Sequence, residues 1–245
     1  MEKAAIAFLD ILGFKGIWQN RNSDDVLKIM GGVGTTIQNS YKQPPPETGW
    51  PKSEPPEITI LSDTIVVVIK SDKPHCLFLL ANIVYDLYRY FWKSNLFLRG
   101  TVSWGDFSQS DSTFLGPAID DVASWYEIAN WIGVVLTPKT NYLMDRFSIT
   151  TIGVNGVQVP PYIKYQVPDK TNKKHNLYAL NWPAYLQANF TLPAIKPNEK
   201  VKMLMFKMFS EQPAFNSSIL EKYENTLKFV DHSLDDLGNR NRLSG

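Results

Sequence analysis

Hydrophobic and polar positions along the chain form short runs of two kinds. Continuous apolar runs rich in β-branched residues are typical of buried strands, and apolar residues at helical spacing are typical of helices with one buried face. The first run, AAIAFLDIL at residues 4–12, predicts a strand that is buried on both faces and interrupted by Asp10. A carboxylate in such a strand needs a partner that offsets its loss of hydration, so Asp10 is a candidate functional residue.

The next pattern is helical. Apolar residues recur at helical spacing between positions 26 and 37, and they predict a helix over residues 24–40 with Ser23 as its cap. Glycines at positions 31, 32 and 34 weaken this helix or allow another backbone to approach it closely. The proline-rich loop that follows, residues 42–56, cannot join the interior of a sheet.

Two β-branched runs, residues 58–61 and 64–69, predict a hairpin that turns at Ser62 and Asp63. A later strand, residues 96–107, alternates between two faces. Phe97, Arg99, Thr101 and Ser103 share one face, whereas Leu98, Val102 and Trp104 share the other. Because arginine, threonine and serine rarely face a core together, we expect the first face to meet a cleft or a second subunit.

The remaining patterns complete a chain of mixed helices and strands. Helices are predicted over residues 74–94, 118–131 and 138–146, strands over 134–136, 148–154, 157–167 and 176–181, and further helices from 183 on. No repeat or linker divides the chain. The predicted fold class is α+β, in one domain with a helical tail.

Composition narrows the functional classes. The chain has 245 residues, of which 44% are apolar, and its formal net charge is +1. This balance argues against broad binding to nucleic acid or to a membrane surface. A single cysteine, Cys76, excludes a disulfide framework, and three scattered histidines disfavour a histidine metal site. No apolar run reaches the length of a membrane span, and the N-terminal run is no secretory signal, so a cytoplasmic location is expected.

Asp10 and Asp63 are the two carboxylates that the pattern singles out. Asp63 alone is an ordinary turn residue, and Asp10 could bond locally. If the fold brings them together they repel each other, unless they share a cation. Hard divalent metals bind such carboxylates together with substrate phosphates.

Several segments in order, FLDILGFK, SDTIVVV, RGTVSWG, FLGPAIDDVASWYE and HNLYALNW, resemble the catalytic domain of class III nucleotidyl cyclases. The resemblance spans about residues 5–182. It implies a ferredoxin-like core with a mixed, mainly antiparallel sheet flanked by helices. It also implies a catalytic core at residues 1–182, with residues 183–245 as a helical extension of the same domain.

The resemblance assigns roles to residues of the first strand and the hairpin. Asp10 and Asp63 would bind two Mg²⁺ or Mn²⁺ ions, with the carbonyl of Ile11 as a further ligand, so that a 3′-hydroxyl attacks the α-phosphate and expels pyrophosphate. The family has Gly-Asp where this chain has Ser62 and Asp63. The backbone cradle for the phosphates would comprise Leu12, Gly13, Phe14 and Lys15.

Departures from the family bear on the base and on the transition state. Thr59 stands where purine cyclases carry a base-reading lysine or glutamate, and it is either a base contact or an ordinary strand residue. The Asn-x-x-x-Arg pattern of those enzymes is missing, since the aligned pairs are Asp121 with Trp125, or Asp120 with Ser124.

Another cation must therefore serve the phosphates if the protein is an enzyme. Arg99 is the leading candidate, acting within one subunit or across a dimer. Lys173 or Lys174 would replace the triphosphate-binding lysine that cyclases carry in a hairpin, unless these lysines belong to a solvated turn.

These departures point to one branch of the family. The chain is similar to the pyrimidine cyclases of bacterial Pycsar anti-phage systems, the PycC family, in its AFLDILGFK opening, Ser-Asp hairpin, RGTVSWG strand and Gly-Pro-Ala helix start. That resemblance implies a uridylate cyclase, with CTP as the second choice of substrate, whose cyclic product acts on a separate effector. Trp50 could stack on the base. The family forms homodimers with active sites at the interface. Two alternatives remain: a cyclase-like module that binds nucleotides without turnover, and a purine cyclase with an unusual base pocket.

Overall fold

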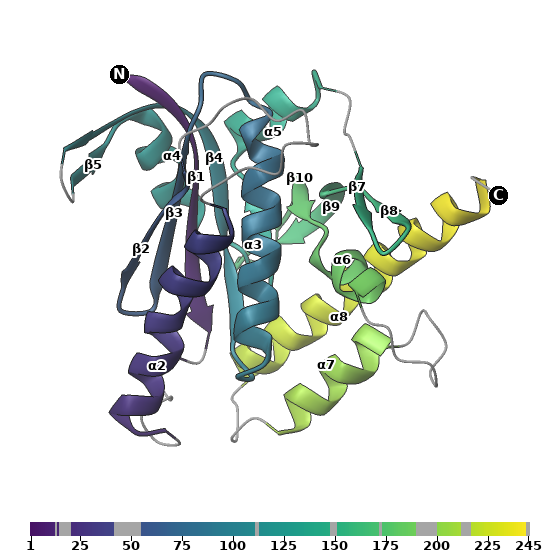
Figure 1. The fold of residues 1–245 in the computed structure, drawn as a ribbon. Helices are drawn as coiled ribbons and strands as arrows, with labels where there is room; N and C mark the ends of the chain where they lie inside the picture. Colours follow the sequence, from purple (N-terminus) through teal and green to yellow (C-terminus); the bar gives the residue numbers. More distant parts are fainter. Residues whose placement is uncertain are drawn as a thin grey trace.

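A mainly antiparallel sheet organises the fold, which is shown in Figure 1 as a computed structural model. Its strands follow the order β2-β3-β1-β4-β6-β10-β9, β5 pairs with β4, and β7 and β8 form a separate hairpin. Only the β4–β6 pair of the described strands is parallel. The strands are β1 Glu2–Leu12, β2 Glu57–Leu61, β3 Thr64–Lys70, β4 Phe97–Ser110, β5 Thr113–Leu115, β6 Val134–Leu136, β7 Ile152–Val154, β8 Val157–Val159, β9 Tyr162–Pro168 and β10 Lys174–Leu180.

The structure describes residues 1–12, 14, 21–41, 55–110, 113–147, 151–171, 173–189, 200–211 and 217–243. Within these ranges no helix combines the length and the apolar character that crossing a membrane requires. The helices are α2 Ser23–Val33, the π-helix η2 Gly34–Gln38, α3 Cys76–Trp92, α4 Pro117–Trp125, α5 Pro138–Met144, α6 Trp182–Asn189, α7 Lys200–Ser210 and α8 Ser217–Leu243.

The first half of the chain has ferredoxin-like topology. Its elements follow the order β1, α2, β2, β3, α3 and β4, and the strands lie side by side as β2-β3-β1-β4, all antiparallel. Helix α3 packs on one face of the sheet, and α4 packs on the other. The predicted α+β class, with a mainly antiparallel sheet flanked by helices, is confirmed.

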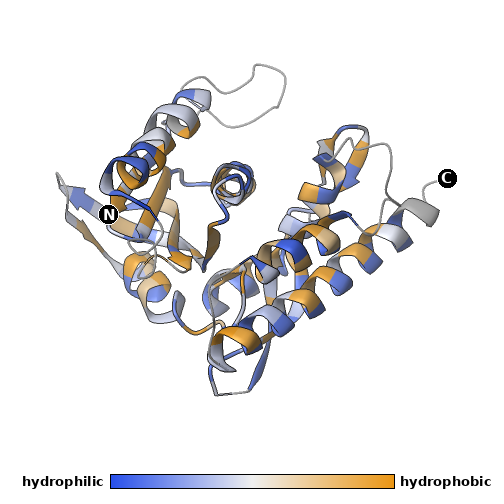
Figure 2. Ribbon diagram, turned by 90° about the horizontal axis from the view of Figure 1, so that it is seen from below, coloured by the Kyte–Doolittle hydropathy of each residue, from blue (hydrophilic) through white to orange (hydrophobic). Residues whose placement is uncertain are grey.

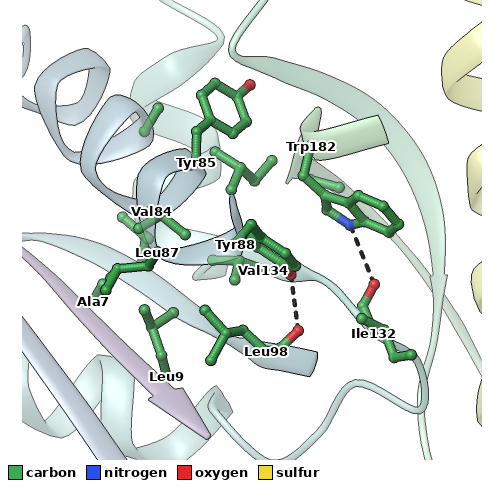
Figure 3. Packing of buried hydrophobic residues seen from close by; sticks show 14 of the residues in the cluster. Ala7, Leu9, Val84, Tyr85, Leu87, Tyr88, Leu98, Ile132, Val134 and Trp182 are labelled. Carbon is green, nitrogen blue, oxygen red and sulfur yellow. Dashed lines mark hydrogen bonds between the residues drawn. The ribbon is translucent and has the colours of Figure 1, made fainter. Parts of the chain in front are cut away.

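The main core lies between the sheet and α3. Leu9 and Leu98 are fully buried, and the Tyr88 hydroxyl of α3 donates a hydrogen bond to the carbonyl of Leu98 at 2.8 Å (Figure 3). Trp182, at the start of α6, stacks on Tyr88 with ring centroids 5.4 Å apart and donates from its indole nitrogen to the carbonyl of Ile132 at 3.3 Å. The helical tail and the sheet therefore share one core. In Figure 2 the long α8 carries hydrophobic and hydrophilic residues in alternation, as expected of a helix with one buried side.

Two details of the predicted first helix are wrong. Asn22 caps it in place of Ser23, because the Asn22 side chain accepts from the backbone nitrogen of Asp25 at 2.8 Å. At Gly32 the group that approaches is a side chain rather than a backbone. The Tyr90 hydroxyl donates to the carbonyl of Ile29 at 2.7 Å, and a Cβ on Gly32 would lie 2.2 Å from that hydroxyl. Helix α4 also ends earlier than predicted, at Trp125.

The predicted hairpin at Ser62 and Asp63 is confirmed, since β2 and β3 pair up to Leu61 and Thr64. Ser62 has a φ of 58°, in the left-handed region that favours glycine. Glycine would adopt this conformation without strain.

We expect Ser62→Val to lower the free energy of unfolding by about 1–2 kcal/mol, because a β-branched side chain is strained at positive φ. Ser62→Gly should not lower it, and Thr113→Val, at an exposed strand position, should change it little. Urea unfolding followed by circular dichroism measures all three. Equal effects of the valine substitutions at 62 and 113 would contradict the strained turn.

Candidate active site

Strand register places Asp10 between the hairpin and β4. Asp10 pairs with Thr64 of β3 on one side and with Arg99 of β4 on the other. Directly paired residues of antiparallel strands share a face of the sheet, so these side chains form one row, which Leu61 of β2 extends. Thr59 belongs to the neighbouring row, with Val66 and Phe8. This is the face on which α4 packs.

An ion pair joins Asp10 to Arg99. The Arg99 Nε donates to the Asp10 Oδ2 at 2.7 Å, and only 12% and 14% of the two side chains are exposed. The arginine therefore provides the partner that a carboxylate in a buried strand requires. Both residues belong to the same chain, so Arg99 reaches Asp10 without a second subunit.

Asp63 lies beside the end of β1. The backbone nitrogen of Ile11 donates to the carbonyl of Asp63 at 2.9 Å, which joins the hairpin turn directly to the residue after Asp10. The Asp63 side chain is half-buried, and among the described residues no group donates a hydrogen bond to its carboxylate. The two singled-out aspartates thus lie on adjoining backbone segments.

The donor groups at this end of β1 fit a hard divalent cation. Carboxylate and carbonyl oxygens are the ligands that Mg²⁺ and Mn²⁺ prefer. Among the described residues nothing bonds to the Asp63 carboxylate, and Arg99 contacts one oxygen of Asp10. The described residues contain no cluster of three or more acidic, histidine or cysteine side chains that could hold a metal ion, so substrate or main-chain oxygens would have to complete a coordination shell.

The polar face of β4 is more buried than the alternation suggested. Thr101 and Ser103 are fully buried, and the Ser103 hydroxyl donates to the carbonyl of Ala118 in α4 at 2.7 Å. The expectation that this face meets a cleft or a second subunit is therefore wrong for these two residues. Helix α4 covers Ser103, whereas Arg99 is bonded to Asp10.

The residues aligned with the missing Asn-x-x-x-Arg pattern have other partners. Asp121 accepts from the Thr137 hydroxyl at 2.5 Å, at the N-cap of α5. Trp125 lies edge-on to His175, with ring centroids 5.6 Å apart. Ser124 donates to the carbonyl of Asp120 at 2.6 Å. Neither alignment supplies a cation.

The segment after α4 brings further charged groups to the site. Tyr126 contacts Phe8 edge-to-face, at 6.3 Å between ring centroids, and its hydroxyl donates to Glu127 at 2.9 Å. That hydrogen bond, then burial, raises the pKa of Tyr126, and the charge of Asp10 adds to the effect. Glu127 also accepts from Lys170 Nζ at 3.3 Å. Hydrogen bonds from Tyr126 and Lys170 lower the pKa of Glu127, and Arg99 lowers it further.

Sequence reasoning did not single out Lys170 or Tyr126. No local signal marks Lys170, because it lies in a charged stretch that also contains Lys173 and Lys174. The structure distinguishes them by their partners, since Lys170, itself exposed, forms an ion pair with Glu127, whereas within the described residues the exposed Lys173 and Lys174 form none.

The other candidate residues have mixed placements. Thr59 is exposed on β2, which forms one edge of the sheet. Leu12 is half-buried at the end of β1, and Phe14 belongs to the main core. Gly13, Lys15 and Trp50 lie outside the described residues.

A tight turn positions Lys170. The Asp169 carboxylate accepts from the backbone nitrogens of Thr171 and Lys173, from the Thr171 hydroxyl, and from His175 Nε2 at 2.9 Å. The hydrogen bond from His175, together with those from Thr171 and Lys173, holds the pKa of Asp169 well below its usual range.

We expect the Asp10–Arg99 pair to show strong coupling in a double-mutant cycle. Asp10→Leu or Arg99→Met leaves a largely buried charge unpaired and should cost about 3 kcal/mol, whereas the double variant should cost much less than the sum. The exposed Lys202–Asp231 pair is the control, and Lys202→Met should cost less than about 1 kcal/mol. Additive effects of the Asp10 and Arg99 substitutions in urea unfolding would contradict the coupling.

The Asp169 turn predicts a pH dependence of stability. The lowered pKa means that the unfolded chain takes up the proton first, so the stabilisation is complete above the ordinary carboxyl pKa of about 4 and is lost as pH falls below it. Asp169→Asn should be less stable than the unsubstituted protein at pH 7, and the difference should shrink towards pH 3. Thermal unfolding across this range checks it, with the exposed Asp235→Asn as control. A difference that is constant with pH would be the contrary result.

Comparison with known proteins gives remote similarities. No protein family and no curated protein matches the sequence. Among solved structures, the chain is similar to an adenylate/guanylate cyclase/hydrolase from Silicibacter pomeroyi, with 15% identity and a TM-score of 0.44 over 72% of this chain and 94% of the other. It is also similar to the catalytic core of a rhodopsin-guanylyl cyclase with converted specificity in complex with ATPαS, with 13% identity and a TM-score of 0.47 over 73% of this chain and 94% of the other. At this level of similarity the two structures assign no function to the chain.

Proposed function

We propose that the protein is a metal-dependent nucleotide cyclase that converts a pyrimidine nucleoside triphosphate, UTP before CTP, into the 3′,5′-cyclic monophosphate and pyrophosphate. The observation that carries the proposal is the junction of Asp10 and Asp63 at the end of β1, with Arg99 bonded to Asp10. The residues in this arrangement belong to the segments whose sequence resembles class III cyclases.

Asp10 and Asp63 would hold the Mg²⁺ or Mn²⁺ ions, with the main-chain carbonyl of Ile11 as a further ligand. When bound, such a cation lowers the pKa of a 3′-hydroxyl and offsets charge on the phosphates. The carboxylates fix the position of the attacking oxygen relative to the α-phosphate. They can do so because β1 holds Asp10 in a strand that is paired on both sides.

Arg99 would serve as the side-chain cation of the reaction. Its side chain is largely withdrawn from water, and a guanidinium in such surroundings stabilises phosphate charge more strongly than one in solvent. One of its nitrogens is committed to Asp10, which leaves other N–H groups of the fork for a phosphate oxygen. This role substitutes for the arginine that α4 lacks.

The pyrimidine choice rests on the resemblance and on Thr59. The Thr59 hydroxyl is exposed on the same face as Asp10 and is free to contact a base. Thr59 lies on an edge strand, which suits contact with a nucleotide bound at the interface of a homodimer. Trp50 remains a second candidate for contact with the base. The proposal includes a cyclic pyrimidine that signals to a separate effector in anti-phage defence.

A nucleotide-binding module without turnover is the second candidate function. At the aligned positions α4 carries Asp121 and Trp125, which contact Thr137 and His175. Neither side chain can replace the amide or the cation of the missing pattern. The binding module would keep the charged end of the sheet as a phosphate site and form no product. A purine cyclase with an unusual base pocket would differ only in the nucleotide that it converts.

The test is incubation of the purified protein with ATP, GTP, CTP and UTP in the presence of Mn²⁺, with products identified by mass spectrometry. We expect a cyclic pyrimidine nucleotide. Asp63→Asn should lower its formation by at least about a hundredfold, since loss of groups that merely support metal ligands already costs 10–100-fold. Asp72→Asn, at an exposed aspartate beyond the other end of β3, is the matched control.

Each outcome decides between the candidates. Cyclic purine in place of cyclic pyrimidine overturns the base assignment but keeps the cyclase. Nucleotide binding with no cyclic product from any of the four substrates favours the binding module. Equal activity of Asp63→Asn and Asp72→Asn would remove Asp63 from the site.

A further inference from the structure

Helix α8 is anchored beside the candidate active site. The Thr226 hydroxyl accepts from the backbone nitrogen of Ile132 at 2.8 Å, and the Asn225 side chain donates to the carbonyl of Asn130 at 3.0 Å. Thr226 is fully buried. Both bonds tie the first half of α8 to the segment between α4 and β6, the segment that also carries Tyr126 and Glu127. Figure 1 shows α8 running past the lower end of the sheet.

The same segment is joined to the turn that carries Lys170. The backbone nitrogen of Asn130 donates to the carbonyl of Pro168 at 2.9 Å, and that of Lys170 donates to the carbonyl of Ile128 at 3.2 Å. Residues 126–133 therefore lie between α8 and the Lys170 turn. This arrangement brings the helical tail and the β9–β10 connection to one place.

The first turns of α8 also reach the strand that carries Arg99. The Tyr223 ring lies edge-on to Phe97, at 6.4 Å between centroids, and stacks on Phe209 of α7 at 3.8 Å. Phe97 is two residues before Arg99 on β4. Lys222, which precedes Tyr223, lies on the same turn of α8.

Lys222 differs from the two neighbouring cations in its partners. Arg99 is paired with Asp10 and Lys170 with Glu127, whereas in the described part of the chain Lys222 Nζ contacts only its own helix, at the hydroxyl and carbonyl of Ser218. Burial lowers the pKa of Lys222, and the positive charges of Arg99 and Lys170 lower it further, against a smaller opposing effect of Glu221. Two cations therefore act on its ammonium group, and each of them is paired with a carboxylate on its other side.

We propose that Arg99, Lys170 and Lys222, the basic cluster, form a binding site for an oligophosphate chain, and that α8 supplies Lys222 to it. Three cations drawn from β4, the β9–β10 turn and α8 suit a ligand with several charged groups in line better than a single small anion. The chain as a whole carries a net charge of only +1, so the clustering is local. Identification of the ligand as the substrate triphosphate, or the pyrophosphate product, rests on the proposed function.

This assignment gives the helical tail a part in the site. Residues 217–243 lie outside the region that resembles cyclases. The sequence pattern of this helix does not single out Lys222 as a functional residue. An anion bound at the cluster would give Lys222 an opposite charge and would tie α8 to the sheet.

The test is isothermal titration with sodium tripolyphosphate in EDTA, which removes divalent metals and requires no turnover. We expect Lys222→Ala to weaken binding by about tenfold or more, since a hydrogen bond to a charged group is lost. Lys222→Gln, which keeps most of the stem, should do the same. Lys228→Ala, at an exposed lysine on the same helix, should leave affinity within about twofold. Circular dichroism checks that each variant is folded.

Two further titrations make the result specific. Orthophosphate should bind much more weakly than tripolyphosphate, and metal-free UTP should lose affinity with Lys222→Ala as tripolyphosphate does. The proposal is overturned if the unsubstituted protein binds no tripolyphosphate, or if folded Lys222→Ala and Lys222→Gln bind it as tightly as Lys228→Ala does. A loss for tripolyphosphate but not for UTP rejects the triphosphate as ligand. Oligophosphate binding without any cyclic product would leave this site intact while refuting the cyclase.

Discussion

The pairing of β1 with β3 on one side and β4 on the other places every residue at the centre of the candidate site. Asp10 lies opposite Thr64 and Arg99 because both ladders keep their register to the end of the strand. A shift of one residue in either pairing would turn Asp10 away from Arg99 and towards the α3 side, where Leu9 and Ile11 are buried. The hydrophobic burial of β1 on both faces therefore fixes the geometry of Asp10.

The extent of α4 determines which part of the sheet face remains polar. This helix covers Ser103 and the small apolar cluster around Ile6 and Val122, and it ends at Trp125. Beyond that cover the face carries charge, with the Asp10–Arg99 pair followed by the Glu127–Lys170 pair. The largely buried pair resists solvent screening, whereas the exposed one is held mainly by the turn around Asp169.

The helices after β10 extend the core that the sheet and α3 begin. Trp182 stacks on Tyr88, and Phe229 of α8 contacts Trp131 at 4.2 Å between ring centroids. These aromatic contacts orient α8 so that its first turns approach β4 and the segment after α4. Stability of the core and placement of Lys222 thus depend on the same packing, which couples the tail to the charged end of the sheet.

The sequence by itself determined the local elements, the α+β class and the two aspartates. Strand alternation, β-branched runs and the Ser62-Asp63 turn depend on neighbouring residues, so a single sequence shows them, and a lone carboxylate in an apolar strand stands out for the same reason. Only the tertiary structure decided that Arg99 binds Asp10, that Thr101 and Ser103 are buried, and that Lys170 pairs with Glu127. It alone also brought Lys222 beside them. Such contacts join residues far apart in the chain, and whether a polar side chain meets solvent, a helix or an opposite charge depends on how the elements pack together.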